Sequence, residues 1–275
     1  PSRTMQVAQK LYEQGFITYM RTDSTNLSAV ASTQIQKVIE KKYGKDQAEP
    51  RVYKTKSKNA QEAHEAIRPT HVDSMNEGIN DEQKRLYRLI WERTVSSQMV
   101  DAKLMKTKIV ANIKSGEIPD FTANGSRVLS PGWLACETEA RGEDVELPLV
   151  EIGEELKLLE LKDTEKATEP PNRYTEAGLV KELEARGIGR PSTYASIMRT
   201  IEDRGYVTKE GRTLFPTDTG DVVSSFLEAN FAEYISDTFT AEMEDELDDI
   251  SNGKREYEKT LKDFYLPFQK DIKEK

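Results

Sequence analysis

The hydrophobic pattern changes period twice along this chain, and that change limits its possible folds more than any other feature. Apolar side chains recur at helical spacing over residues 1–100 and again from Tyr174 onward, whereas over 101–165 short apolar runs alternate with Gly and Pro turns. The pattern predicts an α+β chain, mainly helical, in which a small antiparallel β segment joins helical parts. We expect three domains, at 1–103, 104–170 and 171–275.

Capping residues and turn signals locate the expected elements. In the first domain we expect helices at 4–14, capped by Thr4 and stopped by Gly15, at 28–42, capped by Ser28, and at 81–98, with a β-type run at 16–20. In the second we expect strands at 106–113, 133–137 and 155–161, with turns that include one at Gly125. In the third we expect helices at 176–185, 191–203, 217–231, 241–250 and 255–273, and a hairpin around Gly211.

The order helix, helix, hairpin over 176–215 is that of a winged helix, a fold that presents a helix to nucleic acid. The same order also fits a compact α+β fold with no such role. The pattern therefore suggests winged-helix-like helical parts without identifying their ligand.

Charge is distributed unevenly. The net charge of -9 would disfavour a nucleic-acid partner if it were spread along the chain. However, residues 1–70 carry 12 Lys and Arg against 7 Asp and Glu, and residues 171–215 carry 8 against 6. Residues 101–170 carry 9 against 15, and residues 216–275 carry 7 against 16. Chance produces fluctuations of this size, so charge alone leaves the partner open.

Several classes of protein are excluded by composition. No run approaches the roughly 18 apolar residues of a membrane span, and the first residues lack the apolar core of a signal peptide. The single cysteine, Cys136, cannot form an internal disulfide or a multi-thiolate zinc site. We expect a cytoplasmic monomer without a metal of its own. Because the first residue is proline and a helix begins at once, we also expect a piece of a longer protein.

The stretch ITYMRTDS, residues 17–24, places a phenol two residues from a guanidinium. On a strand, Tyr19 and Arg21 would share a face. A tyrosine with a pKa near 10 is only about a thousandth ionised at neutral pH, so a nucleophilic tyrosine needs a cation that stabilises its phenolate. Arg21 could supply that cation. The same pattern also fits a packed tyrosine followed by an ordinary polar turn.

A second stretch, QEAHEAIRPT at residues 61–70, carries one of the two histidines. On a helix Gln61, His64 and Arg68 would share a face and could present an imidazole and a guanidinium to one phosphate. A single histidine cannot make the paired-histidine zinc motif of metalloproteases, and it is often a structural residue.

A third stretch, RGIGRPSTY at residues 186–194, reads as a glycine-rich corner with proline opening the next helix. The N-terminus of that helix, with Arg186, Arg190, Ser192 and Thr193 beside it, could bind a backbone phosphate. An ordinary helix corner has the same pattern. No Gly-Lys-Ser/Thr follows, so the stretch is not a nucleotide-hydrolysing P-loop.

These three stretches, together with LVKELE at 179–184 and FTAEME at 239–244, resemble type IA DNA topoisomerases in order along nearly the whole chain. Methionine at position 20 favours the bacterial topoisomerase I branch. The resemblance implies that Tyr19 is the nucleophile that attacks single-stranded DNA and forms a 5′-phosphotyrosine. It further implies passage of another strand and resealing without ATP, which relaxes negatively supercoiled DNA. The fold implied is part of a toroidal core, with winged-helix-like (CAP-like) helical domains joined by an antiparallel β arch.

The resemblance also assigns roles to individual residues. It implies that Arg21 stabilises the phosphoryl charge beside Tyr19. The residues it places near the site or on DNA, together with those suggested above, are Gln9, Glu13, Thr18, Thr22, Asp23, His64, Arg68, Arg190, Ser192 and Thr193.

The family's acidic Toprim module, which binds Mg²⁺, and its cysteine-rich zinc modules have no counterpart in this sequence. We therefore expect the chain to bind single-stranded DNA weakly and not to relax plasmids by itself. The parent enzyme would act in the cytoplasm at the nucleoid. One rival interpretation is a non-catalytic winged-helix protein that reads duplex DNA with the helix at 191–203; another is a structural piece without affinity for DNA.

Overall fold

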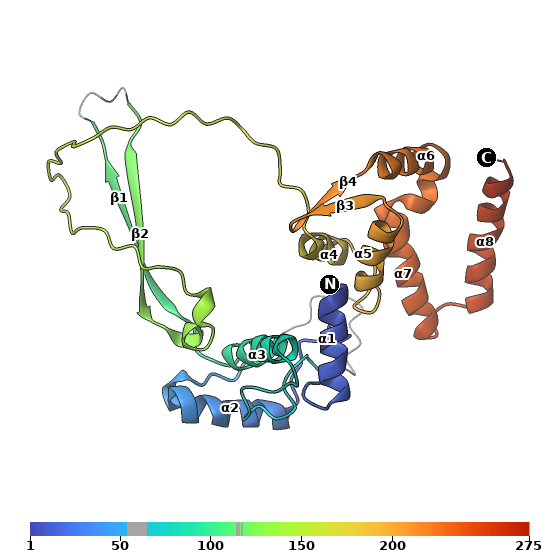
Figure 1. Ribbon diagram of the computed structural model, residues 1–275, viewed down its shortest axis with the longest axis horizontal. Helices are drawn as coiled ribbons and strands as arrows, with labels where there is room; N and C mark the ends of the chain where they lie inside the picture. Colours follow the sequence, from blue (N-terminus) through green and yellow to red (C-terminus); the bar gives the residue numbers. More distant parts are fainter. Residues whose placement is uncertain (54–64, 114–115, 117, 275) are drawn as a thin grey trace. The chain divides into compact units, whose positions relative to one another are not determined.

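The computed structural model describes residues 1–53, 65–113, 116 and 118–274 (Figure 1). Within this part the chain is mainly helical and contains two small antiparallel hairpins, as the sequence predicts. Among the described helices, none has the length and apolar character needed to cross a bilayer. The chain divides into two compact units, each made of segments that are distant in sequence. Unit 1 is the described part of Pro1–Asn26, Lys54–Ile67 and Pro171–Lys275, and unit 2 is the described part of Leu27–Tyr53 and Arg68–Pro170.

Unit 1 joins the first helix to helices from the other end of the chain. Its elements are α1 (Ser2–Glu13), α4 (Glu176–Ala185), α5 (Tyr194–Asp203), β3 (Val207–Glu210), β4 (Thr213–Pro216), α6 (Asp218–Ile235), α7 (Asp237–Ser251) and α8 (Tyr257–Glu274). Helix α1 buries Val7, Ala8 and Leu11 and contacts α5. The Ser2 hydroxyl donates to the carbonyl of Ala195 at 3.2 Å, across 193 positions of sequence. The short hairpin β3–β4 follows α5 directly (Figure 1).

An aromatic cluster connects the last three helices of unit 1. The ring of Tyr234 on α6 makes edge contacts with Phe239 on α7 and with Phe264 and Phe268 on α8, at centroid distances of 5.7, 6.2 and 5.0 Å. Its hydroxyl donates to Asp271 at 2.8 Å. Such ring pairs stabilise packing beyond the area that they bury, so α6, α7 and α8 are held together by one cluster.

Unit 2 is built on two packed helices, from which a β ribbon extends (Figure 1). Its elements are α2 (Ala29–Tyr43), the 3-10 helix η1 (Lys45–Gln47), α3 (Asp81–Ser96), β1 (Lys103–Ala111), β2 (Phe121–Ser130) and the 3-10 helices η2 (Gly132–Ala135) and η3 (Thr138–Ala140). Trp91 of α3 is fully buried, as are Ile35 and Ile39 of α2, and its indole N–H donates to the carbonyl of Val72 at 2.7 Å. Tyr87, Trp91 and Val95, which recur every four residues, form the buried face of α3.

Strands β1 and β2 pair in register from Leu104 opposite Val128 to Ala111 opposite Phe121. The predicted turn at Gly125 is wrong, because Gly125 lies inside β2. A glycine is required there because the chain near Val145 crosses close by: a Cβ at position 125 would lie 2.7 Å from the carbonyl oxygen of Val145. This crossing segment joins the outer edge of β2 through two backbone hydrogen bonds between Ser126 and Val145, at 2.9 and 2.8 Å.

The expected helices are confirmed with small shifts of their ends, whereas three expected strands are wrong. Residues 16–20 form bends with a single bridge at Ile17, residues 133–137 fall in 3-10 turns, and residues 155–161 have no regular structure. In the first case Ile17 and Met20, three positions apart, are the buried residues, which does not fit the alternation of a strand. In the last case every residue of the stretch is exposed, and no strand among the described residues covers it.

Two predicted helix starts are also corrected. Helix α1 begins at Ser2, so Thr4 lies inside it rather than capping it. Helix α5 begins at Tyr194 instead of residue 191, because Pro191 and Ser192 form a turn closed by a hydrogen bond from the Thr193 N–H to the Arg190 carbonyl at 2.9 Å. The Ser28 cap is confirmed, since its hydroxyl accepts from the Ala31 N–H.

Candidate active site

The C-terminal end of α1 sets the position of Tyr19. Gly15 adopts φ +76°, and the N–H groups of Gly15 and Phe16 donate to the carbonyls of Tyr12 and Leu11, both at 2.9 Å. This left-handed cap ends the helix and turns the chain back. Ile17 and Met20 are then buried and anchor the loop. Tyr19, between these anchors, remains 37% exposed, so its ring is fixed by its neighbours while part of it is open to a solute.

The ring of Tyr19 packs edge-to-face against Tyr12 of α1. The two centroids are 5.3 Å apart and the planes make an angle of 71°. This is a favoured geometry for aromatic pairs, and it restrains both rings without burying them. The sequence interpretation missed Tyr12. The signal was present, because Tyr12 lies three residues after Gln9 and so neighbours it on the helix surface.

Gln9 and Glu13 occupy the face of α1 that carries Tyr12. The side-chain amide of Gln9 donates to Glu13 at 2.7 Å, as expected for residues four apart on a helix. The carboxylate and amide are therefore ordered by each other, on the surface from which Tyr12 contacts Tyr19.

Thr18 and Thr22 use their hydroxyls to hold the loop. The Thr18 hydroxyl donates to the carbonyl of Ala66 at 2.7 Å, and the Ala66 N–H donates to the carbonyl of Asn26 at 2.8 Å. The Thr22 hydroxyl accepts from the Ser24 N–H at 3.0 Å, which closes a local turn. Ala66 is thus fixed between two points of the Tyr19 loop. His64, two residues earlier, lies outside the described residues, as does Gln61.

Arg21 is exposed at the surface of the same loop, and the described residues supply no ion-pair partner for it. Its guanidinium is accordingly available to an anion. The predicted strand that would place Arg21 on the same face as Tyr19 is wrong, because residues 17–21 consist of bends with a single bridge at Ile17. Tyr19 and Arg21 are two residues apart in sequence, but no strand aligns their side chains.

Asp23 connects the loop electrostatically to α5. Burial, together with the carboxylates of Glu184 and Asp23, raises the pKa of Tyr194, whereas Arg190 acts in the opposite direction. Tyr194 is the first residue of α5, so the Tyr19 loop and the start of α5 belong to one electrostatic neighbourhood within unit 1. The sequence interpretation did not assign Tyr194 a role of its own.

The predicted phosphate site at the turn between α4 and α5 is already filled by protein groups. The Arg190 guanidinium contacts Asp248 at 3.0 Å and Glu244 at 3.7 Å, both on α7. The Thr193 hydroxyl accepts from the Arg190 N–H at 2.9 Å. Arg186 and Ser192 are exposed, and Arg186 contacts Glu182 on α4 at 2.7 Å. An anion that binds Arg190 would have to displace two carboxylates.

Arg68 belongs to unit 2, and its guanidinium donates to the carbonyl of Pro69 at 2.9 Å. The condition of a helix through this stretch is not met in its described part, since residues 65–68 are not helical. Arg68 therefore does not lie on a helix face, as the sequence suggested for it together with Gln61 and His64.

The described residues contain no group of three or more His, Cys, Asp or Glu side chains placed to hold a metal ion. They therefore do not fit a magnesium site.

Comparison with known proteins matches the family of DNA topoisomerases over residues 1–262. A DNA topoisomerase 1 of Xylella fastidiosa is 45% identical over 99% of this chain, which corresponds to 36% of that protein. A DNA topoisomerase 1 of Vibrio cholerae is 45% identical over 98% of the chain and 31% of its own length. The full-length topoisomerase I of Thermotoga maritima superposes with a TM-score of 0.83 at 36% identity, over 97% of this chain and 45% of that one. The chain thus spans about a third of the length of the curated relatives it matches.

Proposed function

Because the chain belongs to the type IA DNA topoisomerase family, we propose that it forms the tyrosine-bearing part of an enzyme that breaks and reseals one DNA strand. The Tyr19 phenol oxygen attacks a backbone phosphorus and forms a 5′-phosphotyrosine, while the bond from phosphorus to the 3′ oxygen breaks. The phenol proton leaves to solvent or a base, and the 3′ oxygen takes up a proton. Attack by the 3′ hydroxyl reverses these changes after another strand has passed. One phosphodiester replaces another, so no ATP is needed.

The observation that carries this proposal is the exposure of Tyr19 on a loop whose neighbours are buried or hydrogen-bonded. A nucleophile must be both reachable and oriented. Arg21, exposed two residues later, is the group we assign to the developing charge on the phosphoryl oxygens.

We assign DNA-binding roles to the other residues singled out in the sequence. Gln9, Glu13, Thr18, Thr22 and Asp23 surround the reacting phosphate, and His64, Arg68, Arg190, Ser192 and Thr193 hold the strand. For Arg190 the role requires exchange of its carboxylate partners for phosphate. We retain domains at 1–103, 104–170 and 171–275, winged-helix-like helical parts and a place in a toroidal core as part of this proposal.

We propose single-stranded DNA as the partner, a monomeric state, and action in the cytoplasm at the nucleoid. Magnesium would be held by the parent enzyme's Toprim module. This chain alone should bind single strands weakly and leave supercoiled plasmid unrelaxed. Robust relaxation by the isolated chain would refute this division of roles.

The central test is formation of the covalent adduct after the missing module has been fused or added. The wild-type assembly should form an adduct with a single-stranded oligonucleotide at Tyr19, detectable as a protein band that carries labelled DNA. Tyr19→Phe should abolish the band, because no phenol oxygen remains to bond phosphorus. Tyr257→Phe, at another exposed tyrosine of unit 1, is the control and should leave the band unchanged. An adduct in Tyr19→Phe would overturn the assignment.

A second candidate function rests on the observed order of α4, α5 and the hairpin β3–β4. A non-catalytic winged-helix protein would bind duplex DNA tightly and with base preference through α5. The topoisomerase proposal expects preference for single strands and strong salt dependence. Comparing the affinities for duplex and single strands at two salt concentrations separates the two, and absence of binding to both would favour a purely structural piece.

A further inference from the structure

The β ribbon of unit 2 differs in charge from the chain around it. Strands β1 and β2 contain four basic side chains, Lys103, Lys106, Lys108 and Arg127, and no acidic one, in a chain with a net charge of -9. The next 40 residues, 131–170, carry 12 Asp and Glu against 4 Lys and Arg. Residues 101–170 as a whole carry 9 Lys and Arg against 15 Asp and Glu, so the basic character of the two strands is hidden in that sum. The ribbon is a basic element inside an acidic region.

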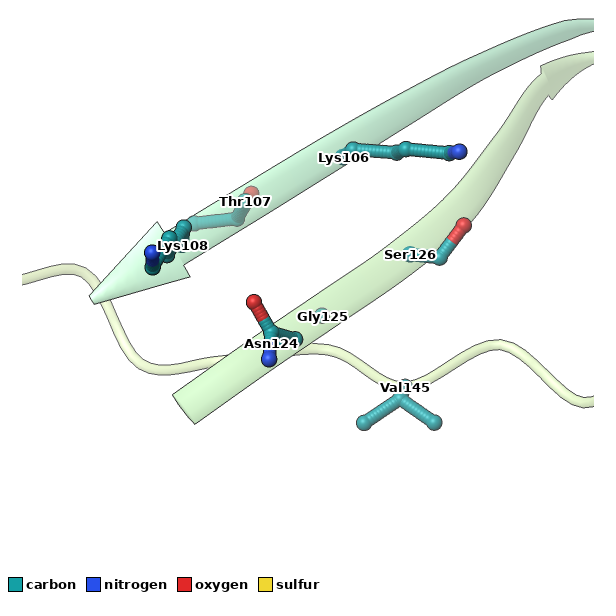
Figure 2. Close-up of a pocket in the computed structure, with 7 residues that line it drawn as sticks. All are labelled: Lys106, Thr107, Lys108, Asn124, Gly125, Ser126 and Val145. Carbon is teal, nitrogen blue, oxygen red and sulfur yellow. The ribbon is translucent and has the colours of Figure 1, made fainter. Parts of the chain in front are cut away.

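Two of the lysines lie on one face of the ribbon, opposite neutral hydrogen-bonding side chains. Lys106 is paired with Ser126, and Lys108 with Asn124. Because alternate residues of a strand share a face, these four side chains lie on the same side. Figure 2 shows Lys106 extending over the space between the strands, toward the side on which Ser126 lies. The four, with Thr107, Gly125 and Val145, line a shallow depression of about 410 Å³.

The protein groups that the structure describes do not compensate the positive charge of this face. Among the described residues, Lys106 and Lys108 have no ion-pair partner, and both are exposed. The nearest acidic residues of the crossing segment are used by arginines: Asp144 contacts Arg141 at 3.0 Å, and Glu146 contacts Arg127 at 3.7 Å. Two lysines on a flat, exposed surface without carboxylate partners fit a ligand that brings its own negative charges.

We infer that this face of the ribbon, with Lys106 and Lys108 as charged contacts and Asn124 and Ser126 as neutral ones, binds the phosphate backbone of a DNA strand. Residues two apart on a strand are separated by about 7 Å, so the lysines form a row that contacts successive negative charges of an extended polyanion. Lysine acts as a point charge that positions a backbone without reading bases. The inference rests on the proposed function for the identity of the polyanion, and it adds a contact surface in unit 2 that is distinct from the Tyr19 loop of unit 1.

The test measures binding of a fluorescent single-stranded oligothymidylate to the whole 275-residue chain by anisotropy, at several salt concentrations. Lys106→Gln/Lys108→Gln removes the two charges and keeps long polar side chains on exposed strand positions. The matched control is Lys157→Gln/Lys166→Gln, which removes two exposed lysines from the acidic part of the same unit. Both double variants change the net charge equally.

The ribbon variant should bind on the order of tenfold more weakly at 0.1 M salt, and its salt slope should fall by about 1.4, as expected for two lost single-strand phosphate contacts. The control should behave as the wild type does. Equal affinity and slope in the two double variants would overturn the inference, as would absence of binding by the wild-type chain. Circular dichroism of the variants checks that the fold is retained.

A second measurement locates the contact and separates DNA from other polyanions. Bound oligonucleotide should protect Lys106 and Lys108 from amine acylation, read by mass spectrometry, while Lys157 and Lys166 remain reactive. Polyglutamate at equal charge concentration should compete poorly, and strong competition would overturn the assignment to DNA. The adduct assay on Tyr19 gives an independent result: adduct formation with no effect of the ribbon variant refutes only the ribbon, and a missing adduct refutes only the proposed chemistry.

Discussion

At the scale of the residue, the candidate site depends on contacts that hold Tyr19 without covering it. The left-handed cap at Gly15, the buried Ile17 and Met20, and the ring of Tyr12 together fix the loop. Of these, only the helix stop at Gly15 follows from local sequence rules. The ring contact depends on how the chain turns after the helix, which a sequence pattern does not specify.

Tyr12 should act as a positioning residue for Tyr19. Tyr12→Leu removes the ring and should slow adduct formation at saturating DNA by roughly two- to tenfold, the range expected from an aromatic pair worth about 0.5–1.5 kcal/mol. Tyr12→Phe keeps the ring and should restore the rate, since only the hydroxyl is lost. The measurement is the rate of adduct formation in the assembled enzyme. If the phenylalanine variant is as slow as the leucine variant, the hydroxyl and not the ring is what matters.

At the scale of the element, α7 supplies carboxylates that would compete with a phosphate for Arg190, in the turn between α4 and α5. Two carboxylates one helical turn apart, Glu244 and Asp248, hold the Arg190 guanidinium. The sequence predicts the glycine-rich corner but not this pairing, because the partners are more than 50 residues apart and meet only after α7 has packed. The error at residues 191–193 has the same origin: hydrogen bonds of the turn prevail over the tendency of proline to open a helix.

Asp248→Asn should strengthen binding of single-stranded DNA by roughly two- to fivefold, because a partly exposed ion pair worth about 0.5–1 kcal/mol no longer occupies Arg190. Asp249→Asn removes the same charge from the same helix, where the carboxylate faces Lys254 at 3.7 Å, and it is the control. Anisotropy titrations at one salt concentration compare the two. A gain of equal size in both variants would show that net charge, and not release of Arg190, is responsible.

Among the elements, the helices are predicted better than the strands. Helix ends carry caps, such as Ser28, that are visible in sequence, whereas a strand exists only where another strand lies beside it. Residues 155–161 have apolar side chains suited to a strand, yet they are exposed and have no regular structure. Strand β2, in contrast, contains Gly125, which predicts a turn from the sequence alone. The crossing segment near Val145 is the reason that a glycine is required there.

At the scale of the whole molecule, unit 1 is made from both ends of the sequence, and no local pattern predicts such an arrangement. The contact between α1 and α5 should survive a cut in the exposed stretch between them. With the recognition sequence of a specific protease inserted after Thr164, the cleaved chain should elute as one species from a gel-filtration column under native conditions. Two species should appear only in denaturant. Separation without denaturant would show that unit 1 does not hold together as described.

The joining of α1 to α5 has a consequence for synthesis on the ribosome. The helix that precedes Tyr19 is synthesised before the surface against which it packs, because that surface begins at Tyr194. Unit 2, whose residues all precede that surface, can fold in the interval. Until Tyr194 and the rest of α5 have been made, the helix that precedes Tyr19 therefore lacks the surface on which it packs in unit 1.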